Sequence, residues 1–288
     1  MPELPEVQTV INYLQQHLLD RTITTVVVHR DKLIKNVSAP TFIKTLAGRK
    51  IVCLARKGKY ILLHLSDNLT IVAHLRMEGK FFIDAPGAPA RPHDYIWFNL
   101  DDGRCLVFND SRQFGTFHLV QTHQLHLLRE LQKVAPDPLE INFDLDDVTA
   151  AIQRSGRNIK TLLLDQSITS GLGNIYANEV LFMTGINPLT PGKALAASQV
   201  AALAAAAREV LSAAIKFNGT TIHSFKFGDN QSGAFVKFLQ VHFRAGQPCR
   251  RCRTPIVRFK DHGRSIYCCP RCQHLNANAL TKPVSDAS

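Results

Sequence analysis

The sequence predicts an α+β protein with three parts: an N-terminal β-sandwich, a helical middle and a C-terminal β-hairpin. Three observations support this fold class. Eight short runs rich in β-branched and aromatic residues fall between residues 22 and 120. Apolar residues at helical spacing dominate residues 145–217. Five of the seven cysteines crowd into residues 249–272, where two short strand-like runs separate two cysteine pairs.

The first predicted element is a helix over residues 7–19, where apolar side chains recur every three or four residues on one face. Pro5 stands just before it, where proline fits a first helical turn. Eight predicted strands follow, separated by turn residues: 22–29, 50–55, 59–65, 68–75, 80–84, 94–100, 104–110 and 115–120. Many short strands of this kind are typical of a sandwich or barrel.

The middle of the chain predicts helices. The segment "APDPL" (135–139) predicts a hinge, and residues 159–166 and 170–182 predict a helix, a tight glycine turn and a second helix. A long alanine-rich helix then ends at Asn218-Gly219, and the polar residues 225–237 predict a loop. We therefore expect domains at residues 1–134, 135–237 and 238–275, with a tail at 276–288.

The charge of the chain favours a polyanionic partner. The formal net charge is +11 and the pI is about 9.5, which points to nucleic acid first and to an anionic membrane surface second. A merely basic surface would give the same charge. No apolar run predicts a membrane span, because Gln199, Arg208 and Glu209 interrupt the longest one. The start of the chain has no signal-peptide pattern, so we expect a cytoplasmic protein.

The clustered cysteines predict one structural zinc ion. Cys249 and Cys252 are separated by two residues, sixteen residues follow, and Cys269 and Cys272 repeat the two-residue spacing. In a reducing compartment, such clusters hold metal more often than they form disulfides, although a redox pair or unrelated thiols remain alternatives. Cys268 could compete as a ligand, but its spacing suits a zinc knuckle less well.

The other residues near the cluster extend this prediction. Residues 254–259 and 264–268 predict the two strands of the hairpin. Basic residues surround the site and suit a duplex groove or phosphate backbone, with a solvated surface as the alternative: Arg250, Arg251, Arg253, Arg258, Lys260 and Arg264. The remaining thiols, Cys53 and Cys105, lie in apolar strands, where we expect them to be buried.

The opening stretch "MPELPE" predicts a nucleophile. If Met1 is removed, Pro2 carries a secondary amine, and an α-amino pKa of about 7.7–8.0 leaves far more neutral amine at pH 7 than the value of about 10.4 for lysine. Attack on a sugar C1′ would form a charged Schiff base. Glu3 and Glu6 could then donate or steer protons. The alternative is a start peptide whose residues merely begin a helix.

A glycine turn opens a second candidate site. The stretch "GLGNIYANE" (171–179) places backbone amides and the Asn174 side chain where they can bind phosphate. Many ordinary helix–turn–helix pairs share this pattern, so alone it decides little.

Together these motifs resemble those of bacterial formamidopyrimidine-DNA glycosylases. The stretches "MPELPEV", "GKYILLHL", "HLRMEGKF", "SRQFGTF", "IKTLLLDQ", "GLGNIYANE" and "CRRC…CPRC" stand in the family's order over roughly residues 1–275. The resemblance implies a helix–two-turn–helix in the helical domain. Leu4 stands where the related endonuclease VIII-like enzymes usually have glycine, which favours the purine-lesion branch.

The resemblance also implies roles for individual residues. Pro2 matches the Schiff-base nucleophile, Glu3 the proton donor and Glu6 a supporting carboxylate. Lys59 matches the lysine of β-elimination, and Arg264 the arginine of δ-elimination. The positions that match or flank DNA-backbone contacts are His74, His93, Lys160, Asn174, Arg154 and Arg157.

Three further residues match a set that fills the hole left by a flipped nucleotide. Met77 and Phe114 would replace lost stacking, and Arg112 would hydrogen-bond the orphaned base. Taken alone, they are ordinary strand-end residues. The chain departs from the family pattern at Gln113, where a second basic residue is common, and at Tyr95, where a histidine is frequent.

We therefore expect a bifunctional DNA glycosylase and AP lyase of base excision repair that removes oxidised purines. Its expected partner is double-stranded DNA containing 8-oxoguanine, formamidopyrimidines or abasic sites, and we expect a monomer with one structural zinc ion and no redox cofactor. Two rivals remain: an oxidised-pyrimidine glycosylase, which Leu4 disfavours, and a non-catalytic damage-binding protein, which Pro2, Glu3 and Lys59 disfavour.

Overall fold

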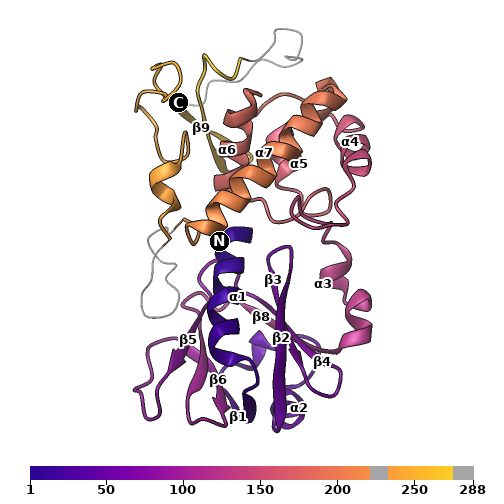
Figure 1. Ribbon diagram of the computed structural model, residues 1–288, viewed down its shortest axis with the longest axis vertical. Helices are drawn as coiled ribbons and strands as arrows, with labels where there is room; N and C mark the ends of the chain where they lie inside the picture. Colours follow the sequence, from indigo (N-terminus) through magenta and orange to yellow (C-terminus); the bar gives the residue numbers. More distant parts are fainter. Residues whose placement is uncertain (221–232, 275–288) are drawn as a thin grey trace. The chain divides into compact units, whose positions relative to one another are not determined.

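The computed structural model describes residues 1–220 and 233–274 and divides the chain into two bodies (Figure 1). We call residues 1–133 and 214–236 the N-terminal body, and residues 134–213 and 237–288 the C-terminal body. Residues 225–232 of the expected loop and the expected tail from residue 276 lie outside the described residues.

The N-terminal body holds eight strands and three α-helices among its described residues before position 134. The helices are α1 (Leu4–Leu18), α2 (Ala39–Leu46) and α3 (Arg129–Gln132), with short 3-10 helices at Asp31–Leu33 and Thr122–Leu127. The strands are β1 (Thr22–Val28), β2 (Arg49–Lys57), β3 (Tyr60–Leu65), β4 (Leu69–His74), β5 (Lys80–Asp84), β6 (Asp94–Leu100), β7 (Cys105–Asn109) and β8 (Thr116–Gln121). Every predicted strand is present.

The strands run antiparallel in the order β5-β7-β6-β1-β2-β3-β4-β8. Only two residue pairs, Thr22 with Lys50 and Ile23 with Arg49, join β1 to β2. The strands therefore form two four-stranded halves linked at one corner, which confirms the predicted β-sandwich.

Helix α1 anchors the core of this body. It contacts β2 and β3 and lies along the strands in Figure 1. Its predicted apolar face, from Val7 to Leu18, is buried. The core also includes Phe98, Phe108 and Phe117, and the last two rings pack edge to face with centroids 4.8 Å apart. Each such buried side chain contributes roughly 1.5–3 kcal/mol, so the core fixes the start of α1 firmly.

Two expectations about this body were wrong. Helix α2 was not predicted, although Ser38 caps it by accepting a hydrogen bond from Thr41 N–H at 3.3 Å. Cys53 is exposed and Cys105 half-buried, whereas both were expected inside. A register shift in β2 between Ile51 and Cys53 interrupts the alternation of sides, so Cys53 faces outward.

The C-terminal body is helical before its hairpin. Its helices are α4 (Leu145–Gln153), α5 (Ile159–Leu163), α6 (Asn174–Thr184) and α7 (Ala197–Lys216), whose last turn belongs to the N-terminal body, with a 3-10 helix at Gly192–Ala194. The hairpin strands are β9 (Val257–Asp261) and β10 (Arg264–Cys268), and a 3-10 helix at Phe235–Phe238 lies within the end of the expected loop 225–237. The predicted long helix and its stop at Asn218-Gly219, both with positive φ, are confirmed.

Helix α7 is long and apolar enough, by length and composition, to cross a membrane. The core helix of a soluble protein passes the same test. Within α7, Val200, Leu203, Val210 and Leu211 are buried on one helical face, whereas Arg208 is exposed and donates to Pro138 O at 2.7 Å. This one-sided burial matches a helix that packs on a protein core.

A buried carboxylate holds the hairpin segment against α6. Glu179 lies in α6 and accepts hydrogen bonds from the backbone N–H groups of Gln240, Val241 and His242 at 2.7–3.0 Å. Burial raises the pKa of Glu179, and these three donors oppose that rise. Asn178, the residue before Glu179, contacts His242 Nδ1 through its side-chain amide at 2.7 Å. Helix α6 and the chain entering the hairpin are therefore one unit.

We predict that Glu179→Ala destabilises the C-terminal body by about 3 kcal/mol, because it leaves three buried N–H groups without an acceptor. Chemical denaturation monitored by circular dichroism measures this loss. Glu209→Ala, on the exposed side of α7, is the control and should change little. Equal stability of the two variants would show that Glu179 does not hold the hairpin.

Candidate functional site

The start of α1 places three of the predicted residues together. Pro2, Glu3 and Glu6 are all buried. Glu3 is the N-cap residue of α1 and Glu6 stands three positions later, so they form a capping box in which Glu3 N–H donates to Glu6 Oε2 at 2.9 Å. Glu6 Oε1 accepts from Thr220 N–H at 2.7 Å and from Thr220 Oγ1 at 3.0 Å. The N-terminus is therefore held in one place rather than left to fray.

The terminal amine of Met1 lies among charged groups and is partly buried, although the Met1 residue as a whole is exposed. Burial lowers the pKa of the Met1 amine below its usual value of 8.0, and Lys59 lowers it further, whereas Glu3, Glu6 and Glu78 raise it. Charges act this way only at short range, so Lys59 and Glu78 lie near the N-terminus. Lys59, in the turn before β3, is itself buried. The site thus favours a neutral amine.

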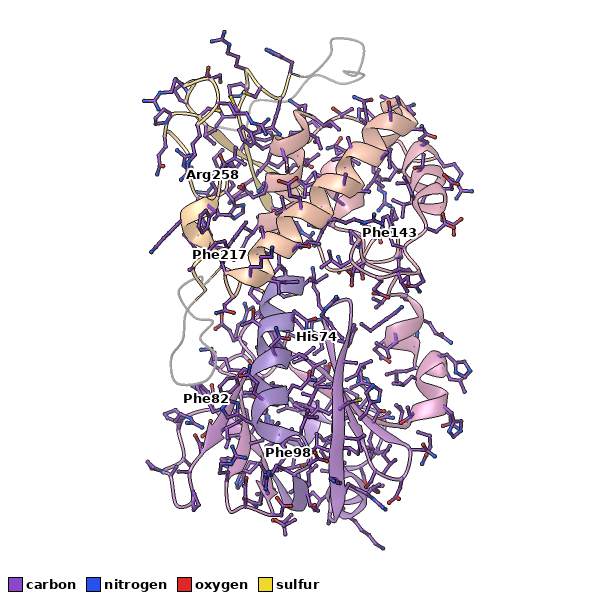
Figure 2. All side chains as sticks on the ribbon, viewed as in Figure 1. His74, Phe82, Phe98, Phe143, Phe217 and Arg258 are labelled. Carbon is purple, nitrogen blue, oxygen red and sulfur yellow. The ribbon has the colours of Figure 1, made fainter. Side chains whose placement is uncertain are left out.

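His74, at the end of β4, is a neutral hydrogen-bond donor (Figure 2). Burial, with smaller contributions from Arg76 and Lys59, lowers the pKa of His74 to about 3. Its Nδ1 accepts the backbone N–H of Arg76 at 2.9 Å, so the proton of the neutral ring sits on Nε2. The Tyr60 ring packs edge to face on it, with centroids 4.5 Å apart. His74 can therefore donate to an anion without carrying charge.

The predicted void-filling residues are displayed to solvent. Met77 is 38% exposed and Phe114 is 52% exposed, which is unusual for large apolar side chains. The Arg112 guanidinium lies 4.8 Å from the centre of the Phe114 ring. Arg112 and Phe114 share the short loop between β7 and β8, and Met77 follows β4. His93 is also exposed and precedes β6.

The C-terminal body carries a basic hollow of about 320 Å³. Arg157, Lys160 and Arg264 line it, beside the carboxylates of Asp165 and Asp261. Lys160 is 2% exposed and donates to Ser265 O at 2.6 Å, which ties α5 to β10. The predicted phosphate contacts from α5 and the hairpin thus meet in one hollow of the right charge. Arg154 is exposed at the end of α4 and is not among these lining residues.

Asn174 begins α6, as the glycine-turn motif predicts. Its side-chain oxygen is buried and has no hydrogen-bond partner among the described residues. Such an atom is costly unless a ligand or water completes it. The start of α6 is therefore a candidate binding position.

The four predicted cysteines fit one structural zinc ion. The four sulfur atoms lie within 4.8 Å of one another. The sulfur atoms of Cys249 and Cys272 lie 3.9 Å apart, and those of Cys252 and Cys269 lie 3.3 Å apart. A tetrahedral zinc ion with bonds of about 2.3 Å needs sulfur atoms about 3.8 Å apart. Cys268 is buried beside this group and is not part of it, as predicted.

The hairpin packs on α6 through a small apolar cluster of Phe182, Val241, Ile256 and Tyr267 with the buried cysteines. Arg251 donates to Phe182 O at 3.0 Å and to Met183 O at 3.2 Å. It therefore caps the end of α6, although the sequence placed it on the basic surface. The guanidinium of Arg251 therefore forms hydrogen bonds within the protein.

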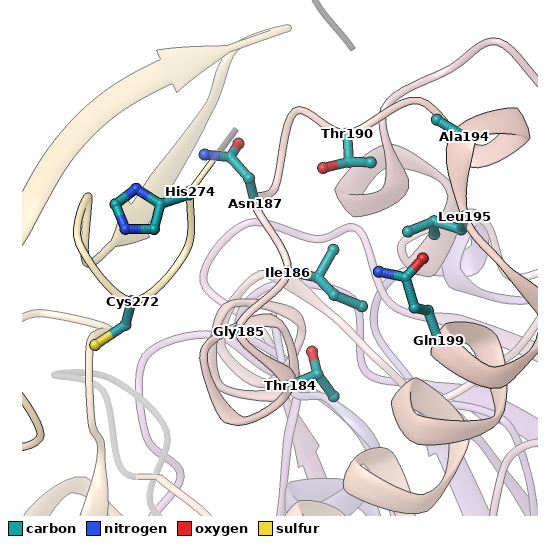
Figure 3. A pocket seen from close by; sticks show the side chains of 10 residues that line it. All are labelled: Thr184, Gly185, Ile186, Asn187, Thr190, Ala194, Leu195, Gln199, Cys272 and His274. Atoms are coloured by element: carbon teal, nitrogen blue, oxygen red, sulfur yellow. The ribbon is translucent and has the colours of Figure 1, made fainter. Parts of the chain in front are cut away.

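A second hollow, of about 350 Å³, lies beside the second zinc knuckle (Figure 3). Its lining includes Asn187, Thr190, Gln199, Cys272 and His274. Apart from the zinc ligand Cys272, it contains none of the predicted site residues. It has no lysine or arginine in its lining, so it does not resemble the basic hollow.

Sequence reasoning missed several residues that shape these sites. Glu78 raises the pKa of the terminal amine, and Thr220 donates a backbone hydrogen bond to Glu6. Each is far in the sequence from the group on which it acts, so no local pattern predicts the contact. Asp110 organises the loop of Arg112 and Phe114. A local signal could have identified Asp110, because it stands just before a short polar turn, where aspartate often accepts backbone hydrogen bonds.

Comparisons with known proteins agree with this picture. Residues 1–117 match the formamidopyrimidine-DNA glycosylase N-terminal domain, residues 134–226 its H2TH domain, and residues 246–275 the zinc finger found in FPG and IleRS. The formamidopyrimidine-DNA glycosylase of Ureaplasma parvum serovar 3 is 44% identical over 275 residues, covering 95% of this chain and 100% of the relative. That of Mycoplasma genitalium is 42% identical, covering 98% and 99%.

Solved structures give the same result. A Lactococcus lactis FPG mutant bound to DNA containing Fapy-dG has a TM-score of 0.89 and 32% identity, covering 95% of this chain and 100% of that one. The Lactococcus lactis Fpg bound to abasic-site DNA has a TM-score of 0.88 and 31% identity over the same shares. With three matching domain models and this identity over nearly its full length, the chain belongs to the formamidopyrimidine-DNA glycosylase family.

Proposed function

We propose that this chain is a bifunctional DNA glycosylase and AP lyase that excises oxidised purines, 8-oxoguanine and formamidopyrimidines, from double-stranded DNA. The observation that carries the proposal is the buried N-terminus, where Pro2 precedes the capping box of Glu3 and Glu6 and lies near Lys59. Once Met1 is removed, the buried Pro2 nitrogen becomes the terminal amine, and a neutral amine with acids beside it suits attack on a sugar carbon. Lesion-containing DNA bound to the Lactococcus relatives supports the choice of substrate.

The proposed reaction begins after loss of Met1. The Pro2 nitrogen attacks C1′ of the damaged nucleotide while the bond from C1′ to the base breaks, and the base leaves with the proton that the Pro2 amine gives up. Glu3 is the proposed proton donor, acting on the sugar ring oxygen as the ring opens to an iminium. Glu3 is buried and caps the start of α1 directly after Pro2, which supports this role.

Two later steps cleave the strand. A proton leaves C2′ of the iminium and the 3′ phosphate departs by β-elimination, for which Lys59 is the proposed helper. A second elimination expels the 5′ phosphate, with Arg264 as the proposed residue that grips it. Glu6 supports the reaction by holding Glu3 and the start of α1. The family resemblance assigns these roles to Lys59 and Arg264, and Lys59 is buried near the N-terminal amine.

The proposed DNA contacts divide into two kinds. Charged contacts come from Lys160, Arg157 and Arg264 in the basic hollow. Neutral hydrogen bonds come from His74 and from the start of α6 at Asn174, with His93 and Arg154 as further proposed backbone contacts. Met77, Arg112 and Phe114 are proposed to fill the space left by the flipped nucleotide. We further propose a cytoplasmic monomer with domain limits at 134, 237 and 275.

An oxidised-pyrimidine glycosylase is a second candidate. A structure of the wild-type Lactococcus lactis relative holds DNA with an oxidised pyrimidine. The comparison of rates on purine and pyrimidine lesions decides between the two, and faster excision of the pyrimidine would reverse our assignment.

Trapping by sodium borohydride tests the nucleophile. Reduction of the iminium should link this protein covalently to DNA containing 8-oxoguanine opposite cytosine, and peptide mapping should place the link on Pro2 with Met1 absent. Pro2→Gly keeps an amine without the ring and should trap poorly. Glu3→Gln should slow base release more than cleavage at a pre-formed abasic site.

A protein with one extra residue before Pro2 is the matched control, because its proline nitrogen is an amide. It should not trap, while its DNA affinity largely survives. A covalent link from this blocked protein that maps to Lys59 would refute the N-terminal mechanism but leave the glycosylase assignment standing.

The zinc hairpin should be structural yet necessary for DNA binding. Cys249→Ser should lower zinc content from about one ion per chain and weaken DNA affinity, because the hairpin has only a small apolar cluster of its own. Metal analysis and a binding titration measure the two effects. Cys53→Ser, at an exposed thiol, should change neither. Full affinity after zinc removal would show that the hairpin does not grip DNA.

Arg112 should read the base opposite the lesion. Arg112→Ala should reduce discrimination between opposite cytosine and adenine by about 1–3 kcal/mol. Excision rates on the two duplexes provide the measurement, with Arg30→Ala, at another exposed arginine, as the control. An equal loss opposite every base would demote Arg112 to a nonspecific contact.

A further inference from the structure

A buried aspartate builds the loop that displays Arg112 and Phe114. Asp110 has no exposed surface, and its carboxylate accepts the backbone N–H groups of Arg112 at 3.1 Å, Phe114 at 2.8 Å and Gly115 at 2.7 Å. Gly115 is required there, because a Cβ would lie 2.5 Å from the Phe108 ring. The backbone of this loop is therefore fixed, and its two exposed side chains start from a rigid base.

This loop is tied to the segment that carries His93. Asp110 N–H donates to His93 O at 3.1 Å, and strands β6 and β7 pair at Asp94 and Asn109. His93 and Gln113 both have positive φ, of 72° and 56°. Non-glycine residues hold this conformation only where their surroundings fix it, and such positions are frequent at binding sites. Two exposed loops thus share one constrained corner of the sheet.

The hydroxyl of Tyr95 joins the two loops through side chains. Gln113 Nε2 donates to Tyr95 Oη at 2.9 Å, and Tyr95 Oη lies 3.4 Å from His93 Nδ1. Since Gln113 fills one lone pair of the phenol oxygen, the phenol proton is available for His93 Nδ1. A ring that accepts at Nδ1 carries its proton on Nε2 when neutral. The hydrogen bonds from Gln113 to Tyr95 and from Tyr95 to His93 therefore place the proton of the neutral ring of His93, an exposed residue, on Nε2.

We propose that Tyr95 is a positioning residue that couples the loop of Arg112 to His93 and sets the tautomer with which His93 meets the DNA backbone. The inference rests on the proposed function, in which Arg112 reads the opposite base and His93 contacts a phosphate. Gln113 holds the Tyr95 hydroxyl, so the two act as one unit. Neither residue needs to touch DNA for this role.

The coupling predicts specific losses. Tyr95→Phe keeps the ring, which packs against the apolar core, and removes only the hydroxyl. We expect affinity for a duplex with a tetrahydrofuran abasic analogue opposite cytosine to fall about two- to ten-fold, since one or two hydrogen bonds are lost. Discrimination against opposite adenine should fall as well. Tyr13→Phe, a half-buried tyrosine that packs against the same core, should change neither.

A double-mutant cycle tests the pairing with Gln113. Gln113→Ala should lose no more than Tyr95→Phe, because it removes only one of the two hydrogen bonds of the Tyr95 hydroxyl, and the double variant should lose about as much as Tyr95→Phe alone. Losses that multiply would overturn the coupled unit. Thermal unfolding and zinc content confirm that each variant is folded.

The ¹⁵N spectrum of histidine gives a readout that does not depend on Arg112. In the full-length protein, His93 should favour the Nε2–H tautomer, and Tyr95→Phe should shift it toward a mixture. An unchanged tautomer would overturn the proposal. Arg112→Ala is measured in parallel for discrimination between opposite cytosine and opposite adenine. If Arg112→Ala leaves this discrimination intact, the proposed role of Arg112 fails. If Arg112→Ala reduces it but Tyr95→Phe does not, the coupling through Tyr95 fails.

Discussion

The carboxylate of Glu6 is the interaction on which the site depends. It accepts Glu3 N–H through one oxygen and the N–H and hydroxyl of Thr220 through the other. Gly219 makes this close approach possible, because a Cβ there would lie 2.6 Å from Glu6 Oε1. Chain termini usually fray unless something ties them down. Here one buried acid fixes the first turn of α1, and with it the places of Pro2 and Glu3.

Burial then sets the protonation states around this fixed point. It lowers the pKa of the terminal amine, and it lowers that of His74 to about 3. Both shifts favour the neutral form of the group, and neutral His74 can donate a hydrogen bond. The charged groups of the C-terminal body, gathered in the basic hollow with Lys160, supply attraction for an anion. In the N-terminal body burial favours neutral groups, whereas the hollow of the C-terminal body is lined by charged groups.

Some of the basic side chains form contacts within the protein. Arg251 caps α6, and Arg258 contacts Ser265 Oγ at 3.1 Å within the hairpin. A count of basic residues therefore overstates the surface available to DNA. Two acidic residues also form internal contacts. Glu179 accepts backbone hydrogen bonds from the segment before the hairpin, and Asp110 accepts them from the loop of Arg112.

The sequence predicted the parts of the fold that short-range patterns encode. Short runs of β-branched and aromatic residues separated by turns predicted all eight strands, the cysteine spacing predicted the zinc site, and the glycine turn predicted the start of α6. Contacts between distant residues, such as Glu6 with Thr220, were missed because no local pattern marks them. Cys53 was expected to be buried because it lies in an apolar run, but a register shift in β2 turns it outward.

Burial lowers the pKa of the Met1 amine, and the proposed mechanism requires the same of the buried Pro2 nitrogen once Met1 is removed. In protein labelled with ¹⁵N-proline and lacking Met1, the nitrogen of Pro2 is the one proline nitrogen that titrates, since the others are amides. Its pKa, followed by NMR in the folded protein and again in urea, provides the most direct test. We predict a lower pKa in the folded state than in urea. An equal or higher pKa in the folded state would contradict the proposed mechanism.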